Sequence, residues 1–215
     1  MADVPRTGKL LAADEFNGEL GGDWSWVRQD DEAVVADGKL SWPLENADMV
    51  GSGNNAGLLF HQTPDRDSWI AETKLHLELG ENDVRNYQQA GMIAYRNDGD
   101  FARLGDVAIW KTRQTEYGRE LVARPSDGAT SYGGAAIGRP APTLWMRLAY
   151  HKNAAGEHVY RAGTSVDGKN WTWGASWVLP AGQTPKLGLF AHGEFTGANP
   201  PPVATFDYLR FYESN

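Results

Sequence analysis

The chain of 215 residues carries 28 acidic and 20 basic side chains, which give a net charge of -8 and a pI of about 5.1. An acidic chain without a basic cluster repels polyanions, so we expect no nucleic-acid partner. No apolar run approaches the ~20 residues of a membrane-spanning helix, so we expect no membrane partner. The absence of cysteine excludes a disulfide scaffold, a zinc–thiolate site and a cysteine nucleophile.

The composition favours one turn-rich β domain. The chain contains 9 Trp, 8 Tyr, 25 Gly and 11 Pro, and 41% of its residues are apolar. No segment shows the i, i+3, i+4, i+7 pattern of an amphipathic helix without Gly, Pro or alternation interrupting it. We expect a single domain over residues 1–215, with residues 1–9 as a loose N-terminal extension.

Runs with strand-like alternation follow one another along the chain, separated by turn signals at roughly the 8 to 12 residue spacing of a sandwich. In chain order the predicted strands cover residues 32–43, 56–62, 69–79, 89–96, 101–110, 113–122, 143–152, 157–166, 172–179, 185–193 and 203–213. The four residues 97–100, NDGD, predict a hairpin, because Asn, Asp and Gly tolerate positive φ angles. The pattern predicts an all-β, antiparallel two-sheet β-sandwich.

The clearest of these strands is WIAETKLHLEL, residues 69–79. Alternation places its apolar residues and its charged residues on opposite faces. The first set is Trp69, Ala71, Thr73, Leu75, Leu77 and Leu79, and the second is Glu72, Lys74, His76 and Glu78.

The order of several segments resembles the concanavalin A-like lectin and glucanase sandwiches, as found in C-terminal accessory domains of family 43 glycoside hydrolases. The segments are DEFNGELGGDWSWVR, ADGKLSWP, NNAGLLFH, NYQQAGMIAYRNDGDFARLG, SVDGKNWTW and ATFDYLRFY. The resemblance covers nearly the whole chain. It implies a jelly-roll sandwich with one concave sheet, whose face or rim loops bind sugar.

The resemblance also implies roles for individual residues. In SVDGKNW, Ser165 and Asp167 hold a turn by hydrogen bonds and Trp171 folds back over it. In the similar sandwiches the paired chain termini hold a structural Ca²⁺, which here predicts Glu15, Asp207 and the Gly38 carbonyl as ligands, with Asp14 nearby. The alternative is that these carboxylates are ordinary rim residues.

We expect no catalysis by the isolated chain. The related glucanases carry an E-x-D-x-x-E strand, and the nearest segment here, ELGEND at residues 78–83, has Gly80 where an acid is required. The five histidines show no metal-binding spacing, and the fifth residue of GTSVDG is Asp167, where a nucleophile elbow needs Gly. The rival interpretation is a stand-alone glycoside hydrolase or polysaccharide lyase whose acids come from separate strands.

Sugar binding is predicted for the block that begins at Tyr87 and ends at Glu120. Amides, carboxylates and guanidinium groups beside an indole suit vicinal hydroxyls, because each polar group makes two hydrogen bonds while the ring stacks. The candidate residues are Glu72, Gln88, Arg103, Trp110, Arg113, Gln114 and Glu116, with Gln89 also in reach. The alternative is a solvated sheet face that carries charge for solubility.

Together these features predict a non-catalytic carbohydrate-binding or accessory module of a polysaccharide-degrading system. Its partners are then an oligo- or polysaccharide and a neighbouring glycoside hydrolase domain. A module that only buttresses a catalytic domain is the second alternative. We expect a secreted, extracellular bacterial protein whose signal or upstream domain is not part of this sequence.

Overall fold

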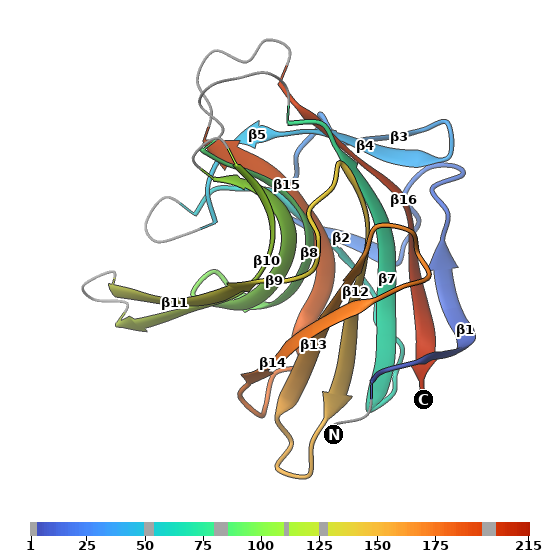
Figure 1. Ribbon diagram of the computed structural model, residues 1–215, viewed down its shortest axis with the longest axis vertical. Coiled ribbons are helices and arrows are strands. Elements are labelled where there is room, and N and C mark those ends of the chain that lie inside the picture. The colour runs from blue at the N-terminus through green and yellow to red at the C-terminus, as the bar shows by residue number, and fades with distance from the viewer. Residues whose placement is uncertain (1–3, 50–53, 80–85, 110–111, 125–128, 195–200) are drawn as a thin grey trace.

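The protein is a two-layer β-sandwich in a computed structural model that describes residues 4–49, 54–79, 86–109, 112–124, 129–194 and 201–215. Each layer is an eight-stranded sheet, and the described residues contain no helix (Figure 1). Consequently no helix that could span a membrane occurs in this part of the chain. All strand pairs named here are antiparallel except β5 with β15.

The back sheet carries both ends of the described chain. Its spatial order is β14 (Thr172–Leu179), β13 (His158–Ser165), β12 (Thr143–Lys152), β7 (Ser68–Leu77), β16 (Val203–Ser214), β4 (Lys39–Pro43) and β3 (Val34–Ala36), and β1 (Thr7–Asp14) also pairs with β16. Because β1 begins at Thr7, opposite Ser214, the predicted loose extension over residues 1–9 is wrong for residues 7–9.

The second sheet curves away from the first, so that its outward face is concave (Figure 1), and we call it the concave sheet. Its order is β11 (Ala129–Ala136), β10 (Thr112–Arg124), β9 (Asp100–Ile109), β8 (Asn86–Asn97), β15 (Lys186–Glu194), β6 (Leu58–His61) and β2 (Trp24–Val27), while β5 (Glu45–Asn46) pairs with β15.

The main core lies between the two sheets and follows from the alternation of the sequence. On β7 the apolar set faces inward, with Trp69, Leu75 and Leu77 all at most 2% exposed. Alternate residues of β8 and β9, among them Met92 and Leu104, meet them from the concave sheet. The period-two pattern therefore gives the inward face of these strands correctly.

The turns that join these strands use the residues that the sequence singled out. Asn97 pairs with Asp100 across the β8–β9 hairpin, and the Asn97 side chain accepts a hydrogen bond from the Gly99 amide at 2.9 Å. In the turn after β13, Asp167 accepts hydrogen bonds from the backbone amides of Lys169 and Asn170 at 2.8 Å each.

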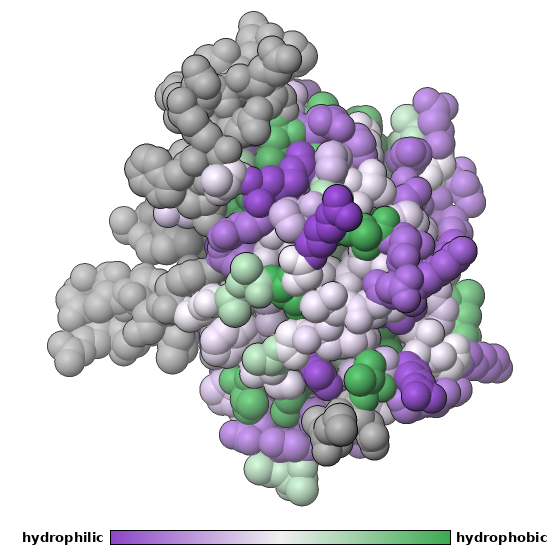
Figure 2. All heavy atoms as spheres, viewed as in Figure 1, coloured by the Kyte–Doolittle hydropathy of each residue, from purple (hydrophilic) through white to green (hydrophobic). Residues whose placement is uncertain are grey.

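Seen from the same direction as in Figure 1, the molecular surface carries both hydrophilic and hydrophobic residues (Figure 2). Among the coloured atoms of Figure 2, hydrophobic residues occur in small groups between hydrophilic ones. The described residues on this face therefore form no large continuous apolar patch of the kind that marks a permanent protein interface.

Candidate carbohydrate-binding site

A cluster of polar side chains lies on the outward face of the concave sheet. Alternation places it there, because the neighbours Ala90, Leu104, Tyr117 and Ala191 face the core. We call the following residues of β8, β9, β10 and β15 the concave cluster: Gln89, Arg103, Gln114, Glu116 and His192. Arg103 lies opposite Gly118 on β10, and Gln89 lies opposite His192 on β15, so the four strands bring the side chains together.

Four members of the concave cluster, Gln89, Arg103, Glu116 and Gln114, form a chain of side-chain contacts. The Arg103 guanidinium donates to the Gln89 side-chain carbonyl and lies 3.6 Å from a Glu116 carboxylate oxygen. The other Glu116 oxygen accepts a hydrogen bond from the Gln114 amide at 3.2 Å. Arg103 and Glu116 are only 5% and 7% exposed, so this charge pair is held largely away from bulk water.

His192 adds an uncharged hydrogen-bond acceptor to this cluster. Its Nδ1 lies 3.0 Å from the Ala47 carbonyl oxygen, which can only accept, so the proton is on Nδ1 and Nε2 is left as an acceptor. Burial, and secondarily the Arg103 charge, lowers the pKa of His192 to about 3. Nε2 is buried and has no hydrogen-bond partner among the residues described.

The other half of the concave face is apolar and already covered. Phe60, Ile93, Phe101 and Phe190 form a second hydrophobic cluster there, together with Leu58, Tyr95, Ala47, Met49 and Ala56. The last three of these belong to the described parts of the connection between β5 and β6 and pack against this face of the sheet.

Polar contacts among Arg28, Asn54 and Asp98 hold the residues next to this apolar cluster in place. Arg28 makes two hydrogen bonds to the Asp98 carboxylate, at 2.9 and 3.0 Å, and another to Asn54 at 3.1 Å. Asn54 in turn donates to the Asp98 carbonyl at 3.1 Å. The polar half of the face is thus bounded on one side by a fixed apolar wall.

Only some of the predicted sugar-binding residues share this face. Arg103, Gln114 and Glu116 lie in the concave cluster, whereas Gln88 and Arg113 point inward between the sheets. Arg113 forms an ion pair with Asp106 at 2.6 Å and donates to the Leu77 carbonyl at 2.8 Å. Their assignment to the binding face is therefore wrong, because alternation sends adjacent residues to opposite faces. Trp110 lies outside the described residues.

Glu72 belongs to a different sheet. It lies on the outward face of the back sheet, where Arg147 and the Tyr208 hydroxyl donate to its two oxygens at 2.6 and 2.8 Å. Its assignment to the concave face is also wrong. The Arg147 guanidinium stacks 3.8 Å from the Trp171 ring centre, so Trp171 packs on this sheet face.

The residues predicted to bind Ca²⁺ are held by cations of the chain itself. Arg210 donates to both Glu15 oxygens at 2.7 and 2.8 Å. Lys74 and Lys39 lie 2.5 and 3.5 Å from the two Asp207 oxygens. No group of three or more His, Cys, Asp or Glu side chains suitable for a metal occurs in the described parts of the chain. In this arrangement the Glu15 and Asp207 carboxylates do not fit a calcium ion, and the Gly38 carbonyl alone does not make a calcium site, since Ca²⁺ takes 6–8 oxygen ligands.

His192 is the member of the concave cluster that sequence reasoning missed. The signal was the alternation of GLFAHG, residues 188–193, which places Phe190 and His192 on the face opposite Leu189 and Ala191. The pairing of β15 with β8 could not be read from that segment, since the two strands are about a hundred residues apart in sequence.

Two packed antiparallel sheets, one of them concave, are the architecture of the concanavalin A-like lectin and glucanase sandwiches. The chain belongs to the family described as the beta xylosidase C-terminal concanavalin A-like domain, whose sequence profile matches residues 13–211. A search of curated proteins finds no match.

Solved structures of low sequence identity share this fold. A GH43 protein from Bacillus licheniformis aligns with a TM-score of 0.68 and 17% identity over 94% of this chain, and a bifunctional GH43-CE protein from Bacteroides eggerthii with 0.71 and 14% over 94%. The chain spans only 39% and 26% of those two chains. Peanut lectin aligns with a TM-score of 0.58 and 12% identity, covering 97% of this chain and 98% of the lectin.

Proposed function

We propose that this chain is a non-catalytic accessory module that binds glycan at the concave cluster. The observation that carries the proposal is the gathering of a buried Arg103–Glu116 charge pair, two amides and an unpartnered His192 acceptor on one concave sheet face. Membership of a family of C-terminal domains of beta xylosidases supports the choice of a glycan as ligand.

The chemistry of the cluster suits a sugar. Glu116 accepts hydrogen bonds, Arg103 and Gln114 donate them, and His192 Nε2 accepts one, so adjacent hydroxyls of a pyranose find both kinds of partner. The covered apolar half of the face blocks extension of a bound chain in that direction. The proposed ligand is therefore a short segment or a chain end of an extracellular polysaccharide, which agrees with a secreted protein.

The experiment is calorimetric titration with a panel of xylo-, arabino-, galacto- and fructo-oligosaccharides. Replacing Glu116 by Gln removes a charged acceptor, and charged hydrogen bonds contribute about 1.5–3 kcal/mol, so affinity should fall roughly ten- to a hundredfold. The matched control is Glu19→Gln in the exposed loop between β1 and β2, which should leave affinity unchanged. Equal binding by both variants would contradict the proposal.

A second candidate is a module that only buttresses a neighbouring catalytic domain. It is favoured by the burial of Glu116 and Gln89, at 7% and 3% exposed, since residues that merely hold a fold together need not be open to ligand. If no oligosaccharide of the panel binds, whereas mixing with a family 43 catalytic domain raises the melting temperature of either partner, buttressing becomes the better account.

The rival interpretation, a stand-alone glycoside hydrolase, requires two acidic residues at one site. Glu72 and Glu116 are the two acids among the predicted sugar-binding residues. They lie on the outward faces of opposite sheets, and packed sheets are about 10 Å apart between their inner faces. These two carboxylates therefore cannot act as a pair on one glycosidic bond.

A further inference from the structure

A cavity of about 380 Å³, separate from the concave cluster, lies at the end of the sandwich where β7 begins. It is lined by the connection between β6 and β7, by the end of β12 and by Thr184 in the connection between β14 and β15. The strand β7 begins at this end, with Ser68, and finishes at Leu77, whose carbonyl accepts from Arg113 near the concave cluster. The cavity is therefore a strand length away from the proposed glycan site.

Aromatic side chains form the base of this cavity. Trp69 and Tyr150 line it, and their ring centres lie 4.8 Å apart. Both are almost wholly buried, at 2% and 5% exposed, and Tyr150 also contacts His158 through its hydroxyl at 3.1 Å. The base is rigid, because these rings pack into the main core.

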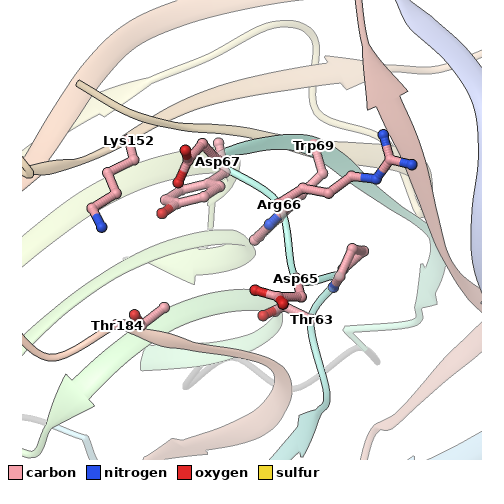
Figure 3. A pocket seen from close by; sticks show the side chains of 9 residues that line it. Thr63, Asp65, Arg66, Asp67, Trp69, Lys152 and Thr184 are labelled. Carbon is pink, nitrogen blue, oxygen red and sulfur yellow. The ribbon is translucent and has the colours of Figure 1, made fainter. Parts of the chain in front are cut away.

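Negatively charged, positively charged and hydroxyl side chains surround the cavity. Figure 3 shows the carboxylates of Asp65 and Asp67, the ammonium of Lys152 and the hydroxyls of Thr63 and Thr184 around one common space. The Arg66 guanidinium points away from this space and forms an ion pair with Glu213 at 3.2 Å. Within the described residues, neither Asp65 nor Asp67 forms an ion pair.

The backbone around the cavity is held in place before any ligand arrives. The Lys152 amide donates to the Asp67 carbonyl at 2.8 Å, the Arg66 amide to the Pro64 carbonyl at 2.8 Å, and the Gln62 amide to the Asp23 carbonyl at 2.8 Å. Since the loop is already ordered, binding there loses little conformational entropy.

The charges around the cavity disfavour an ion as its occupant. Two carboxylates repel an anion, and Lys152 repels a metal cation in a place without a third acidic or histidine ligand among the described residues. A neutral ligand with several hydroxyl groups can hydrogen-bond to the negative and to the positive side chains, because carboxylates accept from hydroxyls while the ammonium and the threonines donate to them.

We propose that this cavity is a second binding site that holds one neutral sugar residue, with Asp65, Asp67 and Lys152 hydrogen-bonded to its hydroxyls over the Trp69–Tyr150 base. Its volume lies at the lower end of the ~300–1,000 Å³ typical of small-ligand sites, which suits a single ring. The inference is independent of the concave cluster. It would let the module hold two glycan chains, or two parts of one chain.

The test is a titration of ¹⁵N-labelled protein with xylose, arabinose, galactose and glucose, followed by amide chemical shifts. At least one sugar should shift the amides of residues 63, 65–67, 152 and 184 with a Kd near about 1 mM. Asp67→Ala and Lys152→Ala should each weaken this binding about tenfold or more. Both side chains are exposed, so the folded spectrum should persist.

The matched control is Asp31→Ala, which removes an exposed carboxylate from the loop between β2 and β3 and should leave the affinity unchanged. Glu116→Gln should also leave these shifts intact, which separates this site from the concave cluster. The proposal is overturned if no sugar shifts these amides, if Asp31→Ala weakens binding as much as Asp67→Ala, or if only calcium or phosphate produces the shifts.

Discussion

Asp106 shows how burial between the two sheets changes the pKa of a single carboxyl group. It points between the sheets with no exposed surface, and its Oδ2 forms an ion pair with Arg113 at 2.6 Å. Burial raises the pKa of Asp106 to about 7, even though Arg113 acts in the opposite direction. In the folded protein this carboxyl therefore keeps its proton to a higher pH than in the unfolded chain.

The first prediction concerns the pH dependence of stability. Between pH 4 and 7 the folded state binds more protons at Asp106 than the unfolded state does, so this residue makes the free energy of unfolding fall as pH rises, with no further change above the folded pKa. Asp106→Asn keeps the shape but does not titrate. Relative to that variant, the natural protein should lose about 1.4 kcal/mol for each unit by which the pKa is displaced.

The measurement is urea unfolding of both proteins at several pH values. Other titrating groups cancel in the difference between the two curves, so the slope of that difference isolates Asp106. A difference that stays constant from pH 4 to 8 would show that Asp106 is ionised throughout this range.

At the scale of elements, the turn after β13 depends on one carboxylate. Asp167 accepts four hydrogen bonds, from the amides of Lys169 and Asn170, the Asn170 side chain and the Ser165 hydroxyl, which lower its pKa. Asp167→Ala should lower the melting temperature at pH 7, because two amides of the turn lose their acceptor.

The pH dependence of that effect has a defined sign. A depressed folded pKa stabilises the protein above the unfolded pKa near 3.8, and this contribution declines as pH falls below that value. The gap in melting temperature between the natural protein and Asp167→Ala should therefore narrow below pH 4. Lys169→Ala, in the same turn, serves as the control, and a comparable loss there would mean that the turn tolerates no substitution.

The paired ends of β1 and β16 give a third prediction. Because Arg210, Lys74 and Lys39 already neutralise Glu15 and Asp207, removal of divalent ions by a chelator should not change the melting temperature. A calcium ion at 100 times its Kd would add about 2.7 kcal/mol, or about 5 to 10 °C for a chain of this size. A rise of that order with millimolar calcium, abolished by Asp207→Ala, would restore the calcium hypothesis.

The strands β7 and β10 show most clearly which features the sequence predicts and which it does not. Alternation assigned Glu72 and Lys74 to the face opposite Leu75, as the structure has them. On β10 the same rule separates Gln114 and Glu116 from Arg113, so the predicted binding set there mixed the two faces of one strand. Alternation could not tell that β7 and β10 belong to different sheets, because strand pairing joins segments far apart in sequence. The fold was thus predictable from local patterns, whereas the membership of the site was not.

At the scale of the whole molecule, the fold is shared with peanut lectin and with parts of two much longer GH43 chains, of which the chain covers 39% and 26%. On the outward side of its concave sheet, apolar residues that include Ala47, Met49 and Ala56 pack over one part, and the largely buried charged and amide groups of the concave cluster lie on another part. We have proposed on this basis that the chain is an accessory module that holds one end or one short segment of a glycan.

The central claim is glycan binding at the concave cluster, and mapping of a bound oligosaccharide onto the assigned amide spectrum tests it most directly. The account predicts that the largest shifts fall on β8, β9, β10 and β15 around Gln89, Arg103, Glu116 and His192, and that His192→Ala abolishes them while the spectrum stays folded. Because burial holds the pKa of His192 near about 3, these shifts should be the same at pH 5 and pH 7. Shifts confined to the outward face of the back sheet around Trp171 and Arg147, or no shifts with any oligosaccharide of the panel, would contradict it.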